Sequence, residues 1–394
     1  MRTLPESASL DHLRRQAKEL LAILRRREPK STLGEAQAAL AREYGFTTWC
    51  DLKAEVSRRR AAPPTIAPDD LVAALVRHFA LGRATAPMRH VEDEWAGHVW
   101  ELETTTGPVL LTQLMDYVKP EHIEVAAGLV DAAVAAGVAA PVPVRTPEGR
   151  VVVTVDGEHW RAHHRIPLGP MPTMPPAPEL AAAAGTALGT LHALALAPPG
   201  PVVPWLTYRR SEDDWEQLVD RARRAGMPWA EALATAVPGF VALDAVRDDR
   251  NPADRAIFSN CDLQPGATRV AGRDQLVITG WDHAGAIPPD WEMANSLMSW
   301  SETIDGPGIL DPAPGRSFLA AYHRRVELPE RLELRMFTAG VSAWLNWTAT
   351  RVMIVLDGDR DDEQLEKARR NVPGLLVEPL SLDRLEQFAA ALVV

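Results

Sequence analysis

Two neighbouring stretches, 259-SNCDLQPGATRV-270 and 277-VITGWDHAGA-286, decide how this sequence is interpreted. The first carries Asp262 just ahead of a proline–glycine turn, and the second brings Asp282 and His283 after a short apolar run. Two carboxylates beside an imidazole support proton transfer if the fold brings them together. We therefore take Asp262, Asp282 and His283 as the candidate catalytic residues.

The composition of the 394-residue chain is typical of a soluble globular protein. Hydrophobic residues make up 46% of it and charged residues 24%, which suits a packed core and two or three domains. The two cysteines, Cys50 and Cys261, match no metal or redox spacing, so a disulfide framework is not expected. The N-terminus has no apolar signal region and no apolar run resembles a membrane span, so we expect a cytoplasmic protein without a membrane partner.

The first sixty residues form a separate, basic segment. They hold 13 lysines and arginines against 8 acidic residues, a net charge of +5, whereas the whole chain carries −11. Apolar positions at helical spacing predict three short helices, in 9–27, 32–45 and 47–56. The third would be the recognition helix of a helix-turn-helix, but its Asp51 and Glu55 argue against nucleic acid. The segment resembles a small helical element that often precedes ankyrin repeats, so we expect it to pack or to bind a protein partner.

Residues 69–165 show a mixed pattern. A helix is predicted from 69 to 81, strands over 97–104 and 108–118, and a helix over 121–137. Asp156-Gly157 between two alternating apolar runs predicts a tight β-hairpin. A proline-rich crossover then leads into a mostly helical remainder, so the fold class is α+β.

The order of these pieces resembles the aminoglycoside phosphotransferase and choline kinase family. The resemblance covers about residues 70–330 and rests on 136-AGVAAPVP-143, 156-DGEHWRAHHRIPLG-169, 185-GTALGTLHAL-194 and the two stretches quoted first. It implies a two-lobed protein-kinase-like fold behind a three-helix N-terminal module. The implied domains are the module at 1–60, an N-lobe at 61–165 and a C-lobe at 166–394.

The resemblance also assigns roles to the catalytic loop, which in the family reads roughly H-G-D-L-H-P-G-N. Asp262 occupies the position of the catalytic Asp, but Ala267 replaces the metal-binding Asn and Gly280 the second metal-binding Asp. Neither side chain offers an oxygen to magnesium. The nucleotide lysine is also missing, because the third strand of the lobe carries Thr112 and Gln113 there. We therefore expect no metal and no nucleotide cofactor.

An acidic run occupies the place of the family's phosphate-covering turn. Glu92, Asp93 and Glu94 would put three negative charges, followed by the bulk of Trp95, where backbone amides normally face phosphate. This further argues against a bound polyphosphate.

Other residues are candidates for contacts with a small-molecule or peptide ligand in the cleft that the resemblance implies. Glu292 matches a family position whose side chain supports the catalytic loop. His192 matches a family position with a structural role in a helix. Tryptophans of the C-lobe provide flat apolar walls. The five candidate ligand-binding residues are Asn260, Trp281, Glu292, Trp344 and Trp347.

Three interpretations of the function stay open. The first is a pseudokinase that binds a small molecule or peptide without transferring phosphate. The second is a repurposed enzyme in which Asp262, with Asp282 or His283, catalyses isomerisation, elimination or cyclisation. The third is an ATP-dependent small-molecule phosphotransferase with a non-standard nucleotide site.

Overall fold

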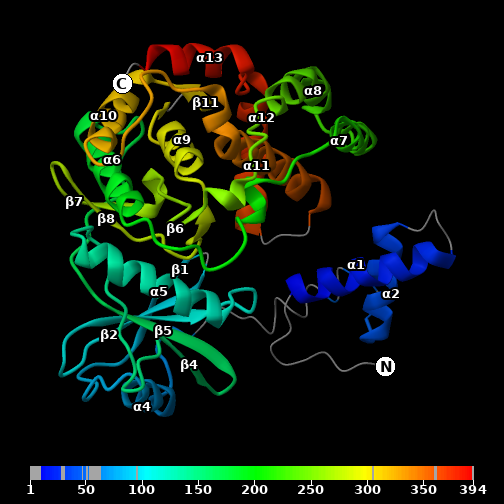
Figure 1. Cartoon of the computed structure of the whole chain (residues 1–394). Coiled ribbons are helices and arrows are strands. Elements are labelled where there is room, and N and C mark those ends of the chain that lie inside the picture. Colours follow the sequence, from blue (N-terminus) through cyan, green and yellow to red (C-terminus); the bar gives the residue numbers. More distant parts are fainter. Residues whose placement is uncertain are drawn as a thin grey trace. The chain divides into compact units, whose positions relative to one another are not determined.

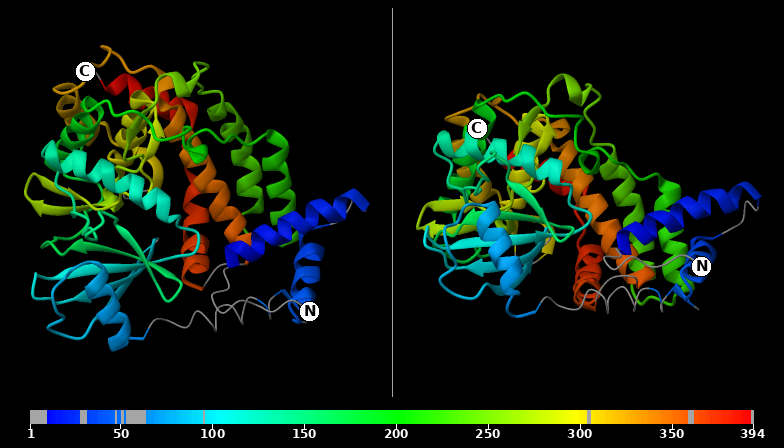
Figure 2. Two further views of the ribbon diagram at one scale, coloured as in Figure 1. Left: turned by 60° about the horizontal axis from the view of Figure 1, so that its bottom comes forward. Right: turned by 90° about the horizontal axis from the view of Figure 1, so that it is seen from below.

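A computed structural model describes residues 10–27, 32–46, 48–49, 52, 64–94, 96–303, 306–358 and 362–392 (Figure 1). The chain divides into two compact units. The first comprises residues 1–123 and 143–165, and the second comprises residues 124–142 and 166–394. Each is described by itself below, with further views in Figure 2.

Two of the three predicted N-terminal helices are present. Helix α1 (Leu10–Arg27) and helix α2 (Leu33–Glu43) pack through a small apolar cluster that includes Leu13, Leu40 and Leu52. Thr32 caps α2 in a capping box, because its hydroxyl accepts from the Glu35 N–H and the Glu35 carboxylate accepts from the Thr32 N–H. The third predicted helix lies largely outside the described residues.

The core of the first unit is a five-stranded antiparallel sheet of order β1-β2-β3-β5-β4. Buried aromatic residues fill it, with the rings of Trp100 and Trp160 6.3 Å apart. Gly97 is required at the start of β2, because an added Cβ would lie 1.9 Å from the Gln113 carbonyl oxygen. The elements are helix α4 (Asp69–His78) and strands β1 (Arg89–Glu94), β2 (Gly97–Leu102), β3 (Val109–Leu114), β4 (Val152–Val155) and β5 (Glu158–His164).

The predicted hairpin at Asp156-Gly157 is confirmed. The last residue pair between strands β4 and β5 is Val155 with Glu158, so Asp156 and Gly157 form the whole turn. Asp156 has φ 51° and Gly157 has φ 84°, as a two-residue type I′ turn requires.

The second unit is mostly helical and contains short two-stranded ribbons. Helix α6 lies close against α10, since a Cβ on Gly185 would lie 2.1 Å from the Phe318 carbonyl oxygen. Ribbon β6–β9 and ribbon β7–β8 flank the loop that carries Asp262. The helices are α5 (Pro120–Ala135, which begins in the first unit), α6 (Pro178–Ala193), α7 (Glu212–Arg224), α8 (Ala230–Asp244), α9 (Pro289–Ser299), α10 (Pro312–His323), α11 (Thr338–Asp357), α12 (Asp362–Val377) and α13 (Leu382–Ala391). The strands are β6 (Ile257–Ser259), β7 (Thr268–Gly272), β8 (Gln275–Ile278), β9 (Gly285–Ile287), β10 (Glu302–Thr303) and β11 (Gly306–Leu310), with 3-10 turns η1 (Pro204–Leu206), η2 (Pro252–Asp254), η3 (Pro265–Ala267) and η4 (Leu334–Phe337).

None of the helices in the described part of the chain combines the length and the apolar character needed to cross a membrane.

Candidate functional site

Asp262 lies on a tight loop between strand β6 and turn η3. Cys261, just before it, has φ 62°, which is the left-handed region that non-glycine residues rarely adopt. The family pattern has glycine at this position, and the conformation explains why. The loop of this protein keeps that backbone shape with a fully buried cysteine.

A buried acid holds the loop in this shape. Glu292 on α9 accepts a hydrogen bond from the Cys261 N–H at 2.6 Å through Oε1, and its Oε2 lies 2.8 Å from His192 Nε2. The other ring nitrogen of His192 lies 2.8 Å from the Tyr322 hydroxyl. All of these groups are buried, so the pairs are shielded from water. The positions that the resemblance marks as structural, Glu292 and His192, thus form one network under the loop.

The side chain of Asn260 also stabilises the loop, through hydrogen bonds to the backbone. Its side-chain Nδ2 donates to the Gly280 carbonyl at 2.6 Å and its Oδ1 accepts from the Asp262 N–H at 3.1 Å. The residue is fully buried. Glu292 and Asn260, both predicted to contact ligand, therefore have geometries that favour positioning Asp262 instead.

Burial raises the pKa of Asp262 to about 6, against opposing effects of the neighbouring His283 and of a hydrogen bond from Gln264. The Gln264 amide donates to Asp262 Oδ1 at 2.7 Å. Negative charge on Glu292 and Asp282 acts in the same direction as burial. A carboxylate with a pKa close to neutrality is suited to accept and release a proton.

Asp282 and His283 are brought to the same region as Asp262. Both are partly exposed, and both lie near enough for their charge to act on the Asp262 carboxylate. The ring of His283 meets the partly exposed Trp205 edge to face, with centroids 6.2 Å apart. The structure therefore gathers the three predicted catalytic residues and adds Trp205 of η1, a C-lobe tryptophan that is not among the five candidate ligand-binding residues.

The two positions that the resemblance assigns to magnesium are packed against each other. A Cβ built on Gly280 would lie 2.6 Å from the Ala267 Cβ. The N–H groups of Thr279 and Gly280 both donate to the Ala267 carbonyl, at 2.9 and 3.0 Å. A side chain at Gly280 would thus meet the methyl group of Ala267 first, and neither residue carries an oxygen that could bind a metal ion. These residues do not fit a magnesium ion held in the manner of the family.

The first unit carries no substitute for the nucleotide lysine at the expected place. Strand β3 has the buried Thr112 there, and Lys119 lies beyond the strand, immediately before α5. Of the acidic run, Asp93 is hydrogen-bonded to His90 and His98 on the same hairpin. Trp95 lies outside the described residues.

The three tryptophans predicted to contact a ligand differ in their burial. Trp281 is 6% exposed and its indole N–H donates to the Ile278 carbonyl at 2.8 Å. Trp344, equally buried, meets the ring of Phe240 at 5.6 Å. Trp347 is partly exposed on α11, with the Arg351 guanidinium 5.2 Å from its ring centre. Of these three, Trp347 is the one that remains open to a ligand.

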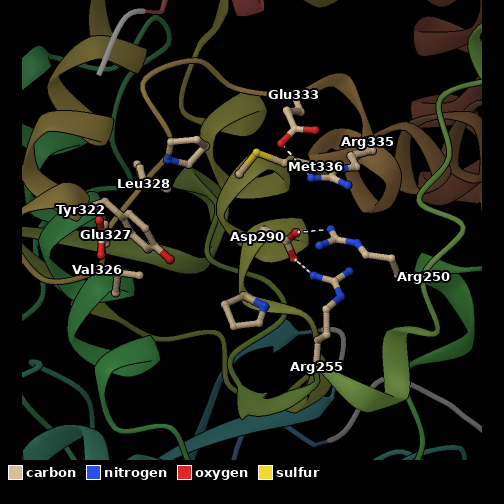
Figure 3. Close-up of a pocket in the computed structure, with 12 residues that line it drawn as sticks. Arg250, Arg255, Asp290, Tyr322, Val326, Glu327, Leu328, Glu333, Arg335 and Met336 are labelled. Carbon is tan, nitrogen blue, oxygen red and sulfur yellow. Dashed lines mark hydrogen bonds and ion pairs between the residues drawn. The ribbon is translucent and has the colours of Figure 1, made fainter.

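A separate pocket of about 440 Å³ lies between the start of α9, the end of α10 and η4 (Figure 3). Its lining holds three arginines and three acidic residues, Glu327 among them, so its formal charges balance. Asp290 pairs with Arg250 and Arg255, and Glu333 pairs with Arg335. Tyr322 lines this pocket, yet it bonds to the network under the Asp262 loop. The compensation makes the pocket a poor match for a strongly charged ligand.

Comparisons with known proteins identify the fold. The sequence matches no protein-family model and no curated protein. The structure is similar to spectinomycin phosphotransferase solved with ADP and spectinomycin, at TM-score 0.58 and 12% identity over 83% of this chain and 99% of that one. It is similar to an amicoumacin kinase solved with AMP-PNP and Ca²⁺, at TM-score 0.54 and 14% identity over 82% and 97%. A microcompartment-associated aminopropanol kinase matches at TM-score 0.53 and 17% identity over 78% and 95%.

These similarities confirm the predicted fold class. The α+β architecture, with its antiparallel sheet and largely helical second unit, is that of aminoglycoside phosphotransferases and related small-molecule kinases. Identities at this level show the fold and leave the activity to be argued from the site.

Proposed function

We propose that this chain is a small-molecule-binding protein of kinase-like fold that does not transfer phosphate through the family's magnesium site. The observation that carries the proposal is the contact between Ala267 and Gly280. A Cβ on Gly280 would lie 2.6 Å from that of Ala267, so ligating side chains have been replaced by close packing. The absence of a lysine from strand β3 agrees with this.

The ligand would bind at the surface formed by Asp262, Asp282, His283 and Trp205. Two carboxylates favour a ligand that carries an amine, and the indole offers an apolar or cation-binding face. Aminopropanol and spectinomycin are suitable first probes, because two proteins of similar structure are an aminopropanol kinase and a spectinomycin phosphotransferase. The pKa of Asp262, raised to about 6 by burial, also suits proton transfer to or from such a ligand.

A second candidate is an ATP-dependent small-molecule kinase with a nucleotide site of a different kind. Two observations favour it. Neighbouring structures that share the fold are small-molecule kinases, two of them solved with ADP or AMP-PNP. The loop of Asp262 is also braced by a complete buried network, as it would be in an active enzyme.

The two candidates are separated by an ADP-release assay. Wild-type protein and the Asp262→Asn variant are incubated with magnesium-ATP and a panel of amino alcohols that includes both probes. The proposal expects no release above that of the variant, while the probes raise the melting temperature of the wild type. Substrate-dependent release that disappears in Asp262→Asn establishes the second candidate. No thermal shift with any amine-bearing probe contradicts the proposed ligand class.

A further inference from the structure

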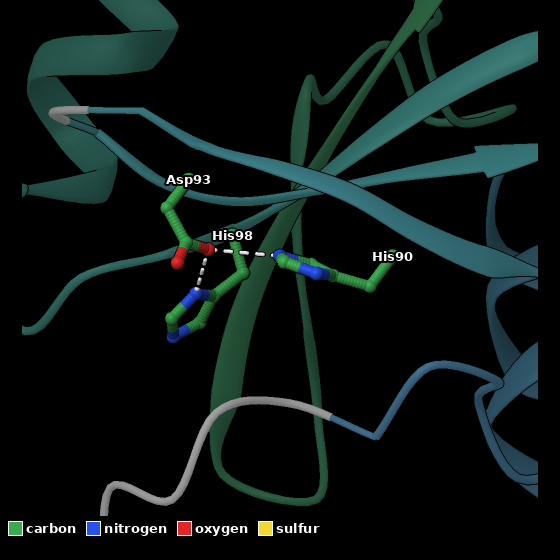
Figure 4. Close-up of side chains that lie close together, drawn as sticks. All are labelled: His90, Asp93 and His98. Atoms are coloured by element: carbon green, nitrogen blue, oxygen red, sulfur yellow. Dashed lines mark hydrogen bonds and ion pairs between the residues drawn. The ribbon is translucent and has the colours of Figure 1, made fainter.

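Three metal-binding side chains converge on the β1–β2 hairpin of the first unit (Figure 4). His90 Nε2 lies 2.8 Å from Asp93 Oδ1, and His98 Nδ1 lies 2.6 Å from the same oxygen. One donor atom from each residue lies within 4.8 Å of the others. Figure 4 shows the two rings approaching the Asp93 carboxylate from different directions.

A β-bulge makes this convergence possible. His90 and Asp93 are three residues apart and would face opposite sides of a regular strand. The register of β1 against β2 shifts between His90 and Glu92, so Val91 is an extra residue on β1. Asp93 then stands directly across from His98, and His90 across from Trp100, so that all four share one face. Bulges of this kind often redirect a side chain toward a site.

The cluster is accessible to an ion from solvent. β1 is an edge strand of the sheet, and the side chains of His90, Asp93 and His98 are 20%, 57% and 27% exposed. The His90 ring is held by an edge-to-face contact with the buried Trp100, with centroids 5.5 Å apart. The His90 ring thus rests against the buried Trp100, and the side chains of Asp93 and His98 are more exposed than that of His90.

We propose that His90, Asp93 and His98 bind a divalent transition-metal ion of the zinc type. Two imidazoles and one carboxylate suit zinc, cobalt or nickel and are a poor set for magnesium. Three protein ligands leave at least one position for water or an exogenous ligand. Bonds of about 2.1 Å place the donor atoms of one ion about 3.0 to 3.4 Å apart. The two nitrogens, now 2.8 and 2.6 Å from Asp93 Oδ1, must therefore move away from that oxygen to admit the ion.

The ion would change the electrostatic character of the hairpin. Glu92, Asp93 and Glu94 carry three negative charges in a row, and a dication offsets two of them. Without a metal ion, these three charges would only repel a phosphate group. With metal bound, the same hairpin presents an open coordination position to an anionic or oxygen-bearing group. The metal site lies in the first unit and does not depend on the ligand proposed for the Asp262 surface, which belongs to the second unit.

The test is a titration of the tag-free, full-length, metal-stripped protein with Zn²⁺ and separately with Co²⁺. We expect one equivalent to bind, with a visible Co²⁺ absorption band that reports nitrogen ligation. His98→Ala and Asp93→Asn are each expected to weaken binding at least ~10-fold. His164→Ala is the matched control, because it removes an exposed histidine from β5 of the same sheet and is expected to leave affinity unchanged.

Failure of the wild type to bind either ion at micromolar concentration overturns the proposal, as does unchanged affinity in both ligand variants. Anomalous scattering at the zinc edge, from wild-type crystals soaked in Zn²⁺, gives a readout that does not depend on a variant folding. A peak among the three side chains supports the site, and a peak elsewhere or no peak overturns it.

Discussion

A β-carbon built on Gly280 lies 2.6 Å from the β-carbon of Ala267, closer than real side chains approach. Gly280 follows strand β8, Ala267 ends turn η3, and hydrogen bonds to the Ala267 carbonyl tie the two segments together. These are the positions at which the resemblance expects metal ligands. The alanine and the glycine at these positions are thus part of one close-packed contact.

Gly280→Ala is expected to destabilise the protein, because the new methyl group overlaps that of Ala267. Overpacking of this kind reduces the free energy of unfolding by about 1 to 3 kcal/mol. Adding Ala267→Gly removes the clash, so the double variant is expected to recover part of the lost stability. Urea unfolding of the wild type, the two single variants and the double variant gives the coupling energy between the two positions. A Gly280→Ala variant as stable as the wild type would contradict the close contact.

Asp262→Asn is expected to change how stability depends on pH. Burial raises the pKa of Asp262 in the folded protein to about 6, whereas the unfolded chain titrates near ~4. Between these values the folded state holds the extra proton, so the wild type loses stability as pH rises through about pH 4 to 6, by about 1 to 3 kcal/mol.

Asn cannot ionise but still accepts the Gln264 hydrogen bond. The Asp262→Asn protein should therefore lack this decline and be more stable than the wild type at neutral pH. Urea denaturation at several pH values measures the difference between the two proteins. Parallel pH profiles would show that Asp262 titrates normally and would remove the argument for a tuned carboxylate.

Removing Glu292 is expected to affect the Asp262 loop far more than removing the Tyr322 hydroxyl. Glu292→Ala leaves the Cys261 N–H and the His192 ring without their buried partner, and we expect a loss of about 3 kcal/mol or more. Tyr322→Phe deletes one hydroxyl at the far end of the network, with an expected loss of about 1 kcal/mol. Thermal and urea unfolding compare the two. Equal losses would mean that the network does not hold the loop.

Cys261 offers a test of the strained backbone before Asp262. Its φ of 62° is unfavourable by about 1 to 2 kcal/mol for a residue with a β-carbon. Cys261→Gly relieves this strain while losing the burial of a small side chain, so stability is expected to stay close to that of the wild type. Cys261→Val is expected to be much less stable, because a β-branched residue is strongly disfavoured at positive φ. If the valine variant is as stable as the glycine variant, the loop does not need the left-handed conformation.

The larger elements of the fold could be predicted because their signals are local. The Asp156-Gly157 turn depends on two adjacent residues, and the structure has it. The start of α2 likewise depends on Thr32 and Glu35, which are only three residues apart. The kinase-like architecture followed from the order of several such pieces along the chain. The comparison with solved small-molecule kinases confirms it.

The site residues were harder to predict from the sequence, because burial decides which side chains can contact a ligand. Asn260 and Trp281 flank the catalytic positions in sequence, yet both face inward and are hydrogen-bonded to backbone. Trp205 is far from His283 along the chain and meets it only through the fold. Residues distant in sequence carry no local signal of their contact.

The cluster of His90, Asp93 and His98 could not be predicted from the sequence for a different reason. Its geometry depends on a bulge at Val91, and a strand pattern with a period of two does not reveal an inserted residue. Only the register of the two strands shows that His90 and Asp93 lie on one face.

We propose that this chain lacks the magnesium–nucleotide arrangement of the kinases whose fold it shares. Calorimetric titration of the wild type with ATP, with and without magnesium, tests this most directly. We expect no magnesium-dependent binding at millimolar ATP, and no change on Asp262→Asn substitution. Tight ATP binding that requires magnesium would contradict the account and establish a nucleotide site built from other residues.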